Sequence, residues 1–255
     1  MRFELLGPLR AWYRGREVDL GPPKQRAVLA VLLLQEGRAL SYDALVDAVW
    51  GTEPPVHVRN LVQKYVSGLR RALAAGPGGP KPVWTGSGYR LTGAAIDDLR
   101  ERHALMRTAL AAQEAGDLRR AAEVAAEGEA LWRGEFAEGL TGPCLEAERR
   151  RWAEKRMLVL ESRLACLIEL GRHDECVHEL VRLVALQPLR ERLVELLMLA
   201  LYRSGRSADA LLAYEEARRR ISEAMGADPG PVLRALHGRI LRQDPALLPA
   251  DAPAA

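Results

Sequence analysis

The sequence feature that most constrains the fold is a change of hydrophobic period at Gly21-Pro22-Pro23. Before this point, apolar and polar residues alternate, with Phe3 and Leu5 as an example, and Gly15 supplies a turn. A period of two bounded by glycine and proline predicts short antiparallel strands. After it, apolar residues recur at steps of three and four, which predicts helices. The chain therefore begins with a small sheet and continues as helix.

Three helices and a hairpin are predicted to follow, with the helices over 24–35, 42–50 and 56–75. Ser41 has the side chain that an N-cap requires, and Gly51 ends the second helix. The turn at 86–88 joins two short strands near 83–85 and 89–91. This order of elements predicts a winged helix-turn-helix, whose second helix enters the DNA major groove.

Charge along the chain favours a nucleic-acid partner for this part. Residues 1–96 hold 13 Lys+Arg against 7 Asp+Glu, and the remainder holds 24 against 27. Residues 54–95 contain no Asp or Glu while carrying six Lys or Arg. A solvated helix face normally mixes both signs, so the alternative of a merely solvated face is disfavoured. The other alternative is that the difference in charge between the two parts of the chain arises by chance, because the whole chain is rich in arginine.

The predicted DNA-binding residues fall into three groups by the chemistry of their side chains. Amide, hydroxyl and amine groups on the exposed face of the third helix are candidates for base edges, and guanidinium groups are candidates for phosphates. Side chains of the hairpin would touch an adjacent groove or backbone. The base-edge candidates are Asn60, Gln63, Lys64 and Ser67. The phosphate candidates are Arg26, Arg59, Arg70, Arg71 and Arg90. The hairpin candidates are Thr85, Ser87 and Tyr89.

The rest of the chain is predicted to be all helix with an internal repeat. Gly171 and Gly205 are 34 residues apart, and each is followed five residues later by a small residue, Cys176 and Ala210. Gly116 repeats the local pattern out of period. A 34-residue helical repeat is typical of tetratricopeptide proteins, which present a groove for protein contacts. The predicted helices are 97–115, 117–132, 143–170, 174–187, 189–203, 207–225 and 231–242.

The predicted fold class is therefore mainly α, with an N-terminal winged helix-turn-helix of small antiparallel sheets plus three helices, followed by an all-α tetratricopeptide-like repeat domain. We place the DNA-binding domain at 1–95, the helical domain at 96–245 and a disordered tail at 246–255. Tryptophans 50, 84, 132 and 152 are interpreted as core anchors rather than as stacking platforms for bases.

Short motifs in order along the chain carry a resemblance to a known family. In the first part they are GPL at 7–9, VDLGPPKQR at 18–26, LVDAVWG at 45–51, VSGLRRAL at 66–73 and GSGYRL at 86–91. In the second part they are ALWRG at 130–134, LGRH at 170–173, PLRERL at 188–193, LALYRSGR at 199–206 and DPGP at 228–231. Together they resemble the Streptomyces antibiotic regulatory protein (SARP) family over about 1–245.

The resemblance implies an OmpR-type winged helix without a receiver domain, joined to a bacterial transcriptional activation domain. It implies binding to direct repeats of double-stranded DNA upstream of promoters of antibiotic biosynthesis genes, with copies side by side on the DNA, and recruitment of RNA polymerase holoenzyme. It also implies a small, stand-alone member of the family. Gly68 departs from the pattern, since many relatives carry a larger residue there. His103 stands where an aromatic core residue is expected.

Other functions find little support in the sequence. No phosphate-binding G-x-x-x-x-G-K-[ST] motif occurs, and no set of nucleophile, base and orienting residue converges, so an enzyme is disfavoured and no cofactor is expected. His173, Cys176 and His178 are too irregular to favour a metal site. A helical-repeat adaptor whose winged domain binds protein remains the alternative, and an effector in the repeat groove stays open.

The cellular compartment is predicted from the apolar runs, the N-terminal residues and the cysteines. The longest apolar run is 27–34, which is too short to span a membrane, and the first residues do not resemble a signal peptide. The three cysteines show no C-x-x-C spacing and are interpreted as reduced. We expect a cytoplasmic, nucleoid-associated protein without a membrane partner.

Overall fold

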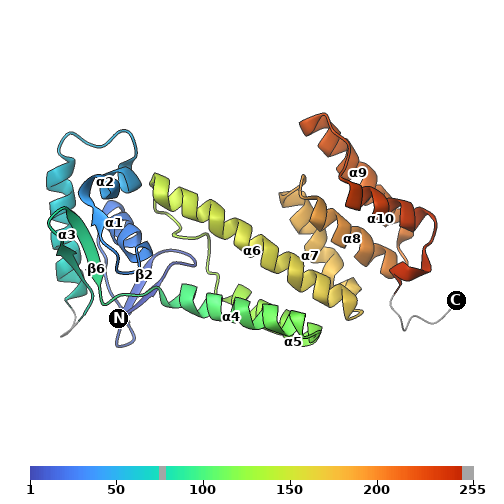
Figure 1. Cartoon of the computed structure of the whole chain (residues 1–255), viewed down its shortest axis with the longest axis horizontal. Helices are drawn as coiled ribbons and strands as arrows, with labels where there is room; N and C mark the ends of the chain where they lie inside the picture. The colour runs from blue at the N-terminus through green and yellow to red at the C-terminus, as the bar shows by residue number, and fades with distance from the viewer. Residues whose placement is uncertain (75–78, 249–255) are drawn as a thin grey trace. The chain divides into compact units, whose positions relative to one another are not determined.

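A computed structural model describes residues 1–74 and 79–248. By its contacts, the chain divides into two compact units (Figure 1). The first unit consists of 1–107 and 127–157, and the second consists of 108–126 and the chain from 158 onward. The chain passes between the units within three helices: α4 (Asp97–Glu114), α5 (Leu118–Ala130) and α6 (Pro143–Glu169).

The predicted N-terminal strands are confirmed. An antiparallel sheet in the order β1-β2-β3 is formed by β1 (Arg2–Glu4), β2 (Arg10–Tyr13) and β3 (Arg16–Glu17). Phe3 lies opposite Ala11 in the register, and both side chains are fully buried. The alternation that predicted the strands therefore corresponds to one buried face.

The three helices of the helix-turn-helix also form, as α1 (Pro23–Leu34), α2 (Tyr42–Trp50) and α3 (Val58–Leu73). Pro23 occupies the first turn of α1, where its missing N–H costs nothing. Ser41 caps α2 by accepting a hydrogen bond from the backbone N–H of Ala44 at 3.2 Å. At the other end, Gly51 ends α2 in a conformation with φ of 70°.

The wing is larger than the predicted hairpin. Besides β5 (Lys81–Trp84) and β6 (Gly88–Thr92), it includes β4 (Leu40–Ser41), which pairs with β6 to give the order β4-β6-β5. Two residues are too few to show a period, so β4 could not be predicted from the hydrophobic pattern. Ser41 belongs to β4 and also caps α2, so the wing is joined directly to the start of α2.

The core of the first unit draws on residues far beyond the wing. Phe136, Leu140, Leu145 and Trp152 belong to the same buried cluster as the residues of β1 and α1. The backbone is tied in as well, because the N–H groups of 133, 137 and 138 donate to the carbonyls of 6, 5 and 7. The contacts thus group 127–157 with the winged helix, whereas the domain boundary near residue 95 stays a prediction.

Two buried charges stabilise the start of α4. The carboxylate of Asp98 accepts hydrogen bonds from the N–H groups of Leu5 and Leu6 at 2.7 and 2.8 Å. Arg102 is fully buried, and its guanidinium donates to the carbonyl of Gly128 at 2.8 Å. The expectation of a core residue at His103 was wrong: Arg102, one position earlier, points inward, and His103 is exposed.

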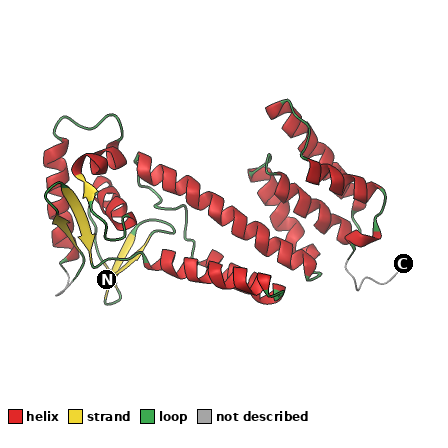
Figure 2. Ribbon diagram, viewed as in Figure 1, coloured by secondary structure: helices red, strands yellow, loops and turns green. Residues whose placement is uncertain are grey.

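The second unit is built from helices, as Figure 2 shows. Besides parts of α4, α5 and α6, it contains α7 (His173–Leu186), α8 (Glu191–Arg203), α9 (Ser207–Met225), α10 (Pro231–Leu241) and the short 3-10 helix η1 (Pro245–Leu247). Among these, α8 packs against α7, α9 and α10. The bounds of α9 coincide with the predicted 207–225.

Three identical turns confirm the repeat. Gly116, Gly171 and Gly205 all have φ between 75° and 79°, a left-handed conformation that favours glycine. After each glycine, the next residue donates its N–H to the carbonyl five positions back, as Arg172 does to Leu167. This is the hydrogen bond that closes a Schellman motif at a helix C-terminus. Ala121, Cys176 and Ala210, five residues after the glycines, are buried.

The predicted tail lies largely outside the described residues, since 249–255 are not described. Its first part is ordered: η1 contains Leu247, which is buried, and the carbonyl of Leu247 accepts a hydrogen bond from Arg203 at 2.8 Å. Among the described residues, no helix is both long and apolar enough to cross a membrane.

Candidate nucleic-acid interface

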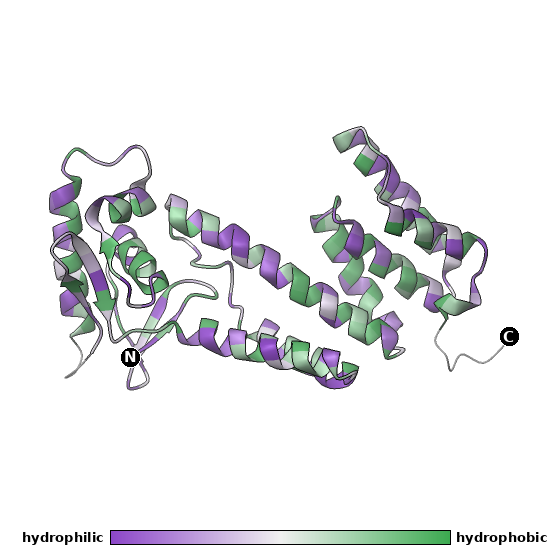
Figure 3. Cartoon of the chain, in the orientation of Figure 1, coloured by the Kyte–Doolittle hydropathy of each residue, from purple (hydrophilic) through white to green (hydrophobic). Residues whose placement is uncertain are grey.

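Helix α3 is strongly amphipathic. Its buried residues, Val62, Val66, Leu69 and Leu73, follow steps of three and four and pack towards α1. In Figure 3, α1 is green over most of its length, whereas α3 alternates between purple and green. All seven polar residues predicted on the outer face are exposed. They are Arg59, Asn60, Gln63, Lys64, Ser67, Arg70 and Arg71.

A direct contact holds the wing beside α3. The Nε of Arg70 donates to the backbone carbonyl of Pro82 in β5 at 2.9 Å. At the end of β5, Trp84 meets Tyr89 of β6 edge to face, with ring centroids 5.1 Å apart. Arg70 therefore has a structural role besides its predicted contact with phosphate.

Between α3, the wing and the start of α2 lies a cavity of about 590 Å³. Arg59, Gln63 and Arg70 line it from α3, and Trp84 and Ser87 line it from the wing. At the α2 wall, the guanidinium of Arg59 lies 5.9 Å from the ring centroid of Tyr42. Burial raises the pKa of Tyr42, and the charge of Arg59 opposes that shift. The cavity thus presents cationic, amide and hydroxyl groups together with one carboxylate, that of Asp43.

Five cations of this surface lack acidic partners. Within residues 1–74 and 79–248, no ion pair is formed by Arg59, Lys64, Arg70, Arg71 or Arg90. In the second unit most arginines do form one, as Arg163 does with Glu179 and Arg192 with Glu195. We refer to these five cations, together with Asn60, Gln63 and Ser67, as the α3 surface. No ion pair among the described residues neutralises these five cations, which is the electrostatic pattern of a nucleic-acid-binding surface.

The remaining predicted site residues differ in their exposure. Thr85, Ser87 and Arg90 are exposed on the wing. Arg26 in α1 is half-buried. Tyr89 is only 7% exposed, because it packs beneath Trp84. Contacts of all these residues with DNA stay predictions, and the burial of Tyr89 makes it the least accessible of them.

Sequence reasoning did not assign the aromatic residues Trp84 and Tyr42 to this cavity. Trp84 was interpreted as a core anchor, but it is 47% exposed, so that interpretation was wrong. Its position next to the turn at 86–88 is the signal that could have placed it on the surface. Tyr42 gave no such signal, because its neighbours come from α3 and from the other strand of the wing.

The absence of a side chain at position 68 has a packing cause. A Cβ on Gly68 would lie 2.2 Å from Oε1 of Gln25 in α1. Gln25 is itself buried and donates from Nε2 to the carbonyl of Leu20 at 2.9 Å. Gly68 therefore allows α3 to approach α1 closely and faces the protein interior.

The fold and the α3 surface define a winged-helix protein with an attached tetratricopeptide-like helical region. Comparison with known families agrees with this class. Residues 15–91 match the family described as "Transcriptional regulatory protein, C terminal", and 97–241 match "Bacterial transcriptional activator domain". The chain belongs to the SARP family of transcriptional regulators.

Several characterised proteins are similar to almost the whole chain. Regulatory protein AfsR of Streptomyces coelicolor is 45% identical over 97% of this chain, and regulatory protein DnrI of Streptomyces peucetius is 34% identical over 97%. The match covers 25% of AfsR and 94% of DnrI, so the chain spans about a quarter of the length of AfsR.

A solved structure shares the fold. Mycobacterium tuberculosis EmbR, in complex with a low-affinity phosphopeptide, superposes with a TM-score of 0.83 at 35% identity. The match covers 96% of this chain and 65% of that one.

Proposed function

We propose that this protein binds duplex DNA and activates transcription. In this proposal α3 enters the major groove, whose width of about 12 Å accepts a helix. The wing lies along the neighbouring backbone or minor groove. The observation that carries the proposal is the α3 surface, where five cations form no ion pair within the described residues, while most arginines of the second unit do form one.

The roles of individual side chains follow from their chemistry and position. Asn60, Gln63, Lys64 and Ser67 lie in the exposed part of α3 and are proposed to contact base edges. Arg59, Arg71 and Arg90 are proposed to bind phosphates, as is the half-buried Arg26. Arg70 both holds the wing through Pro82 and contributes charge.

The salt dependence of DNA binding tests this proposal. Neutralising about 4–6 phosphates predicts that log K falls against log salt with a slope of about −4 to −5. The measurement is fluorescence anisotropy of a labelled promoter duplex titrated with the full chain. Arg71→Gln should reduce the slope by about one. Arg218→Gln is the matched control, because it removes an exposed arginine of the second unit. A flat salt response would refute the proposal.

The finer parts of the proposal concern the target and the partner. We propose that two copies bind side by side, head to tail, on direct repeats about one DNA turn apart. The resemblance to AfsR and DnrI supports promoters of antibiotic biosynthesis genes as targets. The helical unit would recruit RNA polymerase holoenzyme and contact the neighbouring copy.

Reconstituted transcription tests this second part. Variants of the second unit that bind DNA normally should lose activation, if that unit recruits the polymerase. Footprinting on the same template shows whether the protected sites form a direct repeat. If the chain gives neither a footprint nor a gel shift, this result would instead favour the adaptor alternative, in which the winged domain binds protein.

A further inference from the structure

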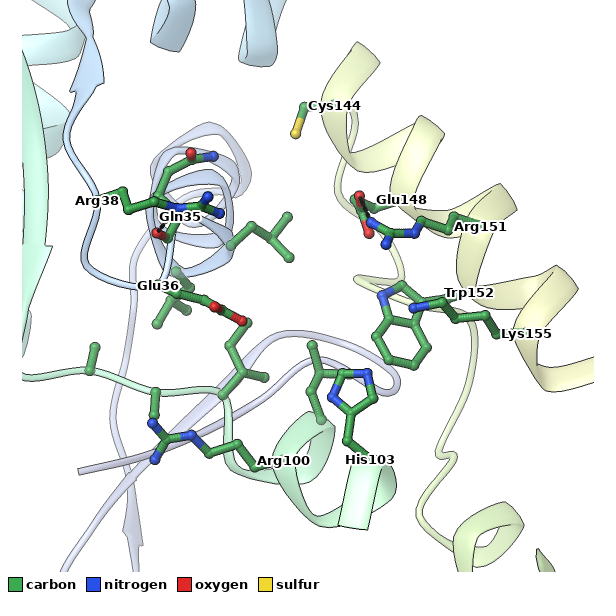
Figure 4. A pocket seen from close by; sticks show the side chains of 16 residues that line it. Gln35, Glu36, Arg38, Arg100, His103, Cys144, Glu148, Arg151, Trp152 and Lys155 are labelled. Atoms are coloured by element: carbon green, nitrogen blue, oxygen red, sulfur yellow. Dashed lines mark hydrogen bonds and ion pairs between the residues drawn. The ribbon is translucent and has the colours of Figure 1, made fainter. Parts of the chain in front are cut away.

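A second cavity, of about 680 Å³, lies within the first unit and away from the α3 surface. Its walls are the C-terminal end of α1, the segment that leads into α4, and the N-terminal part of α6 (Figure 4). Apolar side chains form part of its lining, including Leu34, Ile96 and Leu99. Small-molecule sites in proteins span about 300–1,000 Å³, so the cavity has the size of a ligand site.

The charged side chains around this cavity are mostly positive. Arg38, Arg100, Arg151 and Lys155 line it, against Glu36 and Glu148. Arg151 is paired with Glu148 at 3.2 Å, as the dashed line in Figure 4 marks. Arg100 and Lys155 form no ion pair in the parts of the chain that the structure describes. Two cations are thus available to an anionic ligand.

Aromatic rings form the wall beside Lys155. Figure 4 shows the imidazole of His103, on α4, close to the indole of Trp152, on α6, and their ring centroids lie 5.3 Å apart. The ammonium of Lys155 lies 4.5 Å from the Trp152 centroid. Trp152 is buried, whereas His103 is exposed.

The pKa values of His103 and Lys155 reflect the positive charges around them. The pKa of His103 is lowered, first by burial and then by the charges of Lys155 and Arg107. Burial and the charge of Arg151 likewise lower the pKa of Lys155. The surroundings of His103 and Lys155 are therefore positive, and a negative group placed there would relieve the repulsion among these cations.

We propose that this cavity binds a small aromatic molecule that carries a carboxylate or a similar anionic group. The ring would lie against His103 and the apolar lining, and the anion would pair with Lys155, while Arg100 adds positive charge at another wall of the cavity. This site goes beyond the proposed DNA binding, because none of its residues belongs to the α3 surface.

Anilinonaphthalene sulfonate, a fluorescent aromatic anion, is the probe that tests the site. Titration of the full chain should give saturable binding of one probe per chain, and naphthoate should compete with it. The neutral analogue phenylnaphthylamine should bind at least about tenfold more weakly, because it lacks the charge-assisted hydrogen bonds. Equal binding of the neutral analogue would overturn the proposal.

Variants locate the bound probe. Lys155→Gln should raise the dissociation constant about tenfold, and Arg100→Gln should raise it by a smaller factor, because Arg100 lies at another wall of the cavity. Arg150→Gln is the matched control, because Arg150 is exposed on α6 and is not among the lining residues. Thermal melting of each variant shows whether it folds. If Lys155→Gln does not fold, Arg100→Gln and Lys155→Arg carry the test, and Lys155→Arg should keep most of the affinity.

Unchanged affinity in the folded Lys155 and Arg100 variants would overturn the site. DNA binding measured on the same samples separates this proposal from the proposed function. A chain that binds the promoter duplex but not the probe lacks the ligand site, whereas one that binds the probe but not DNA lacks the proposed function.

Discussion

Gly68 of α3 lies directly against Gln25 of α1, so that a Cβ at position 68 would come within 2.2 Å of the Gln25 side-chain oxygen. Gln25 cannot simply rotate away, because its amide nitrogen donates to the carbonyl of Leu20 in a buried position. The close approach of two helices thus depends on a glycine that helix propensity alone disfavours.

Gly68→Ala is therefore expected to destabilise the protein. Alanine gains about 1 kcal/mol in helix propensity, but overpacking costs about 1–3 kcal/mol. We expect the free energy of unfolding to fall by about 1 kcal/mol, measured by urea denaturation. In a Gln25→Ala background the same substitution should be neutral or stabilising. A stabilising effect of Gly68→Ala alone would contradict the packing account.

Lys64→Ala should separate base recognition from phosphate binding. Lys64 is exposed on α3 and forms no ion pair within the described residues. If it contacts a base edge, its loss weakens binding to the specific duplex by about 1–3 kcal/mol and leaves binding to random DNA much less affected. Competition anisotropy with both duplexes makes the comparison. Equal losses on the two duplexes would assign Lys64 to the backbone.

A fragment of residues 1–96 should be less stable than a fragment of 1–157. The shorter fragment lacks Phe136, Leu140, Leu145 and Trp152, all buried in the core of the first unit. Each fully buried apolar side chain contributes roughly 1.5–3 kcal/mol, so the combined loss rivals the stability of a small domain. Thermal unfolding followed by circular dichroism compares them. A cooperative transition at the same temperature in both fragments would be evidence against a shared core.

The three thiols should differ in their reactivity towards iodoacetamide. Burial raises the pKa of Cys176 to about 11, so at about pH 8 only about one thiol in a thousand is ionised. Because the thiolate is the nucleophile, alkylation of Cys176 should accelerate about tenfold per pH unit below that pKa. Half-buried Cys144 should react first, ahead of buried Cys166 and Cys176. Mass spectrometry of the peptides measures this order, and equally rapid labelling of all three would contradict it.

The sequence predicted those parts of the fold that depend on local patterns. Ser41 and Gly51 marked the ends of α2, and the glycines at 171 and 205 marked the repeat turns, because capping and left-handed turns need particular residues. Features that depend on partners distant in sequence were missed. The two residues of β4 carry no period, and the inward turn of Arg102 depends on Gly128.

The candidate DNA-binding site was predictable to the extent that it lies on one helix. The spacing of α3 placed its seven outer residues correctly on the exposed face. The wing was less predictable, because the exposure of Trp84 and the burial of Tyr89 depend on how two strands meet. The Arg70 contact with Pro82 could not be derived from either segment alone.

The backbone bonds from 133–138 to the carbonyls of 5–7 have a practical consequence for engineering. A chimera that exchanges DNA specificity between relatives at residue 96 would combine residues 5–7 from one parent with residues 133–138 from the other. Moving 1–157 as one cassette keeps residues 5–7 and 133–138 from the same parent. Chimeras joined after residue 157 should therefore accumulate in the cell to higher levels than chimeras joined at residue 96.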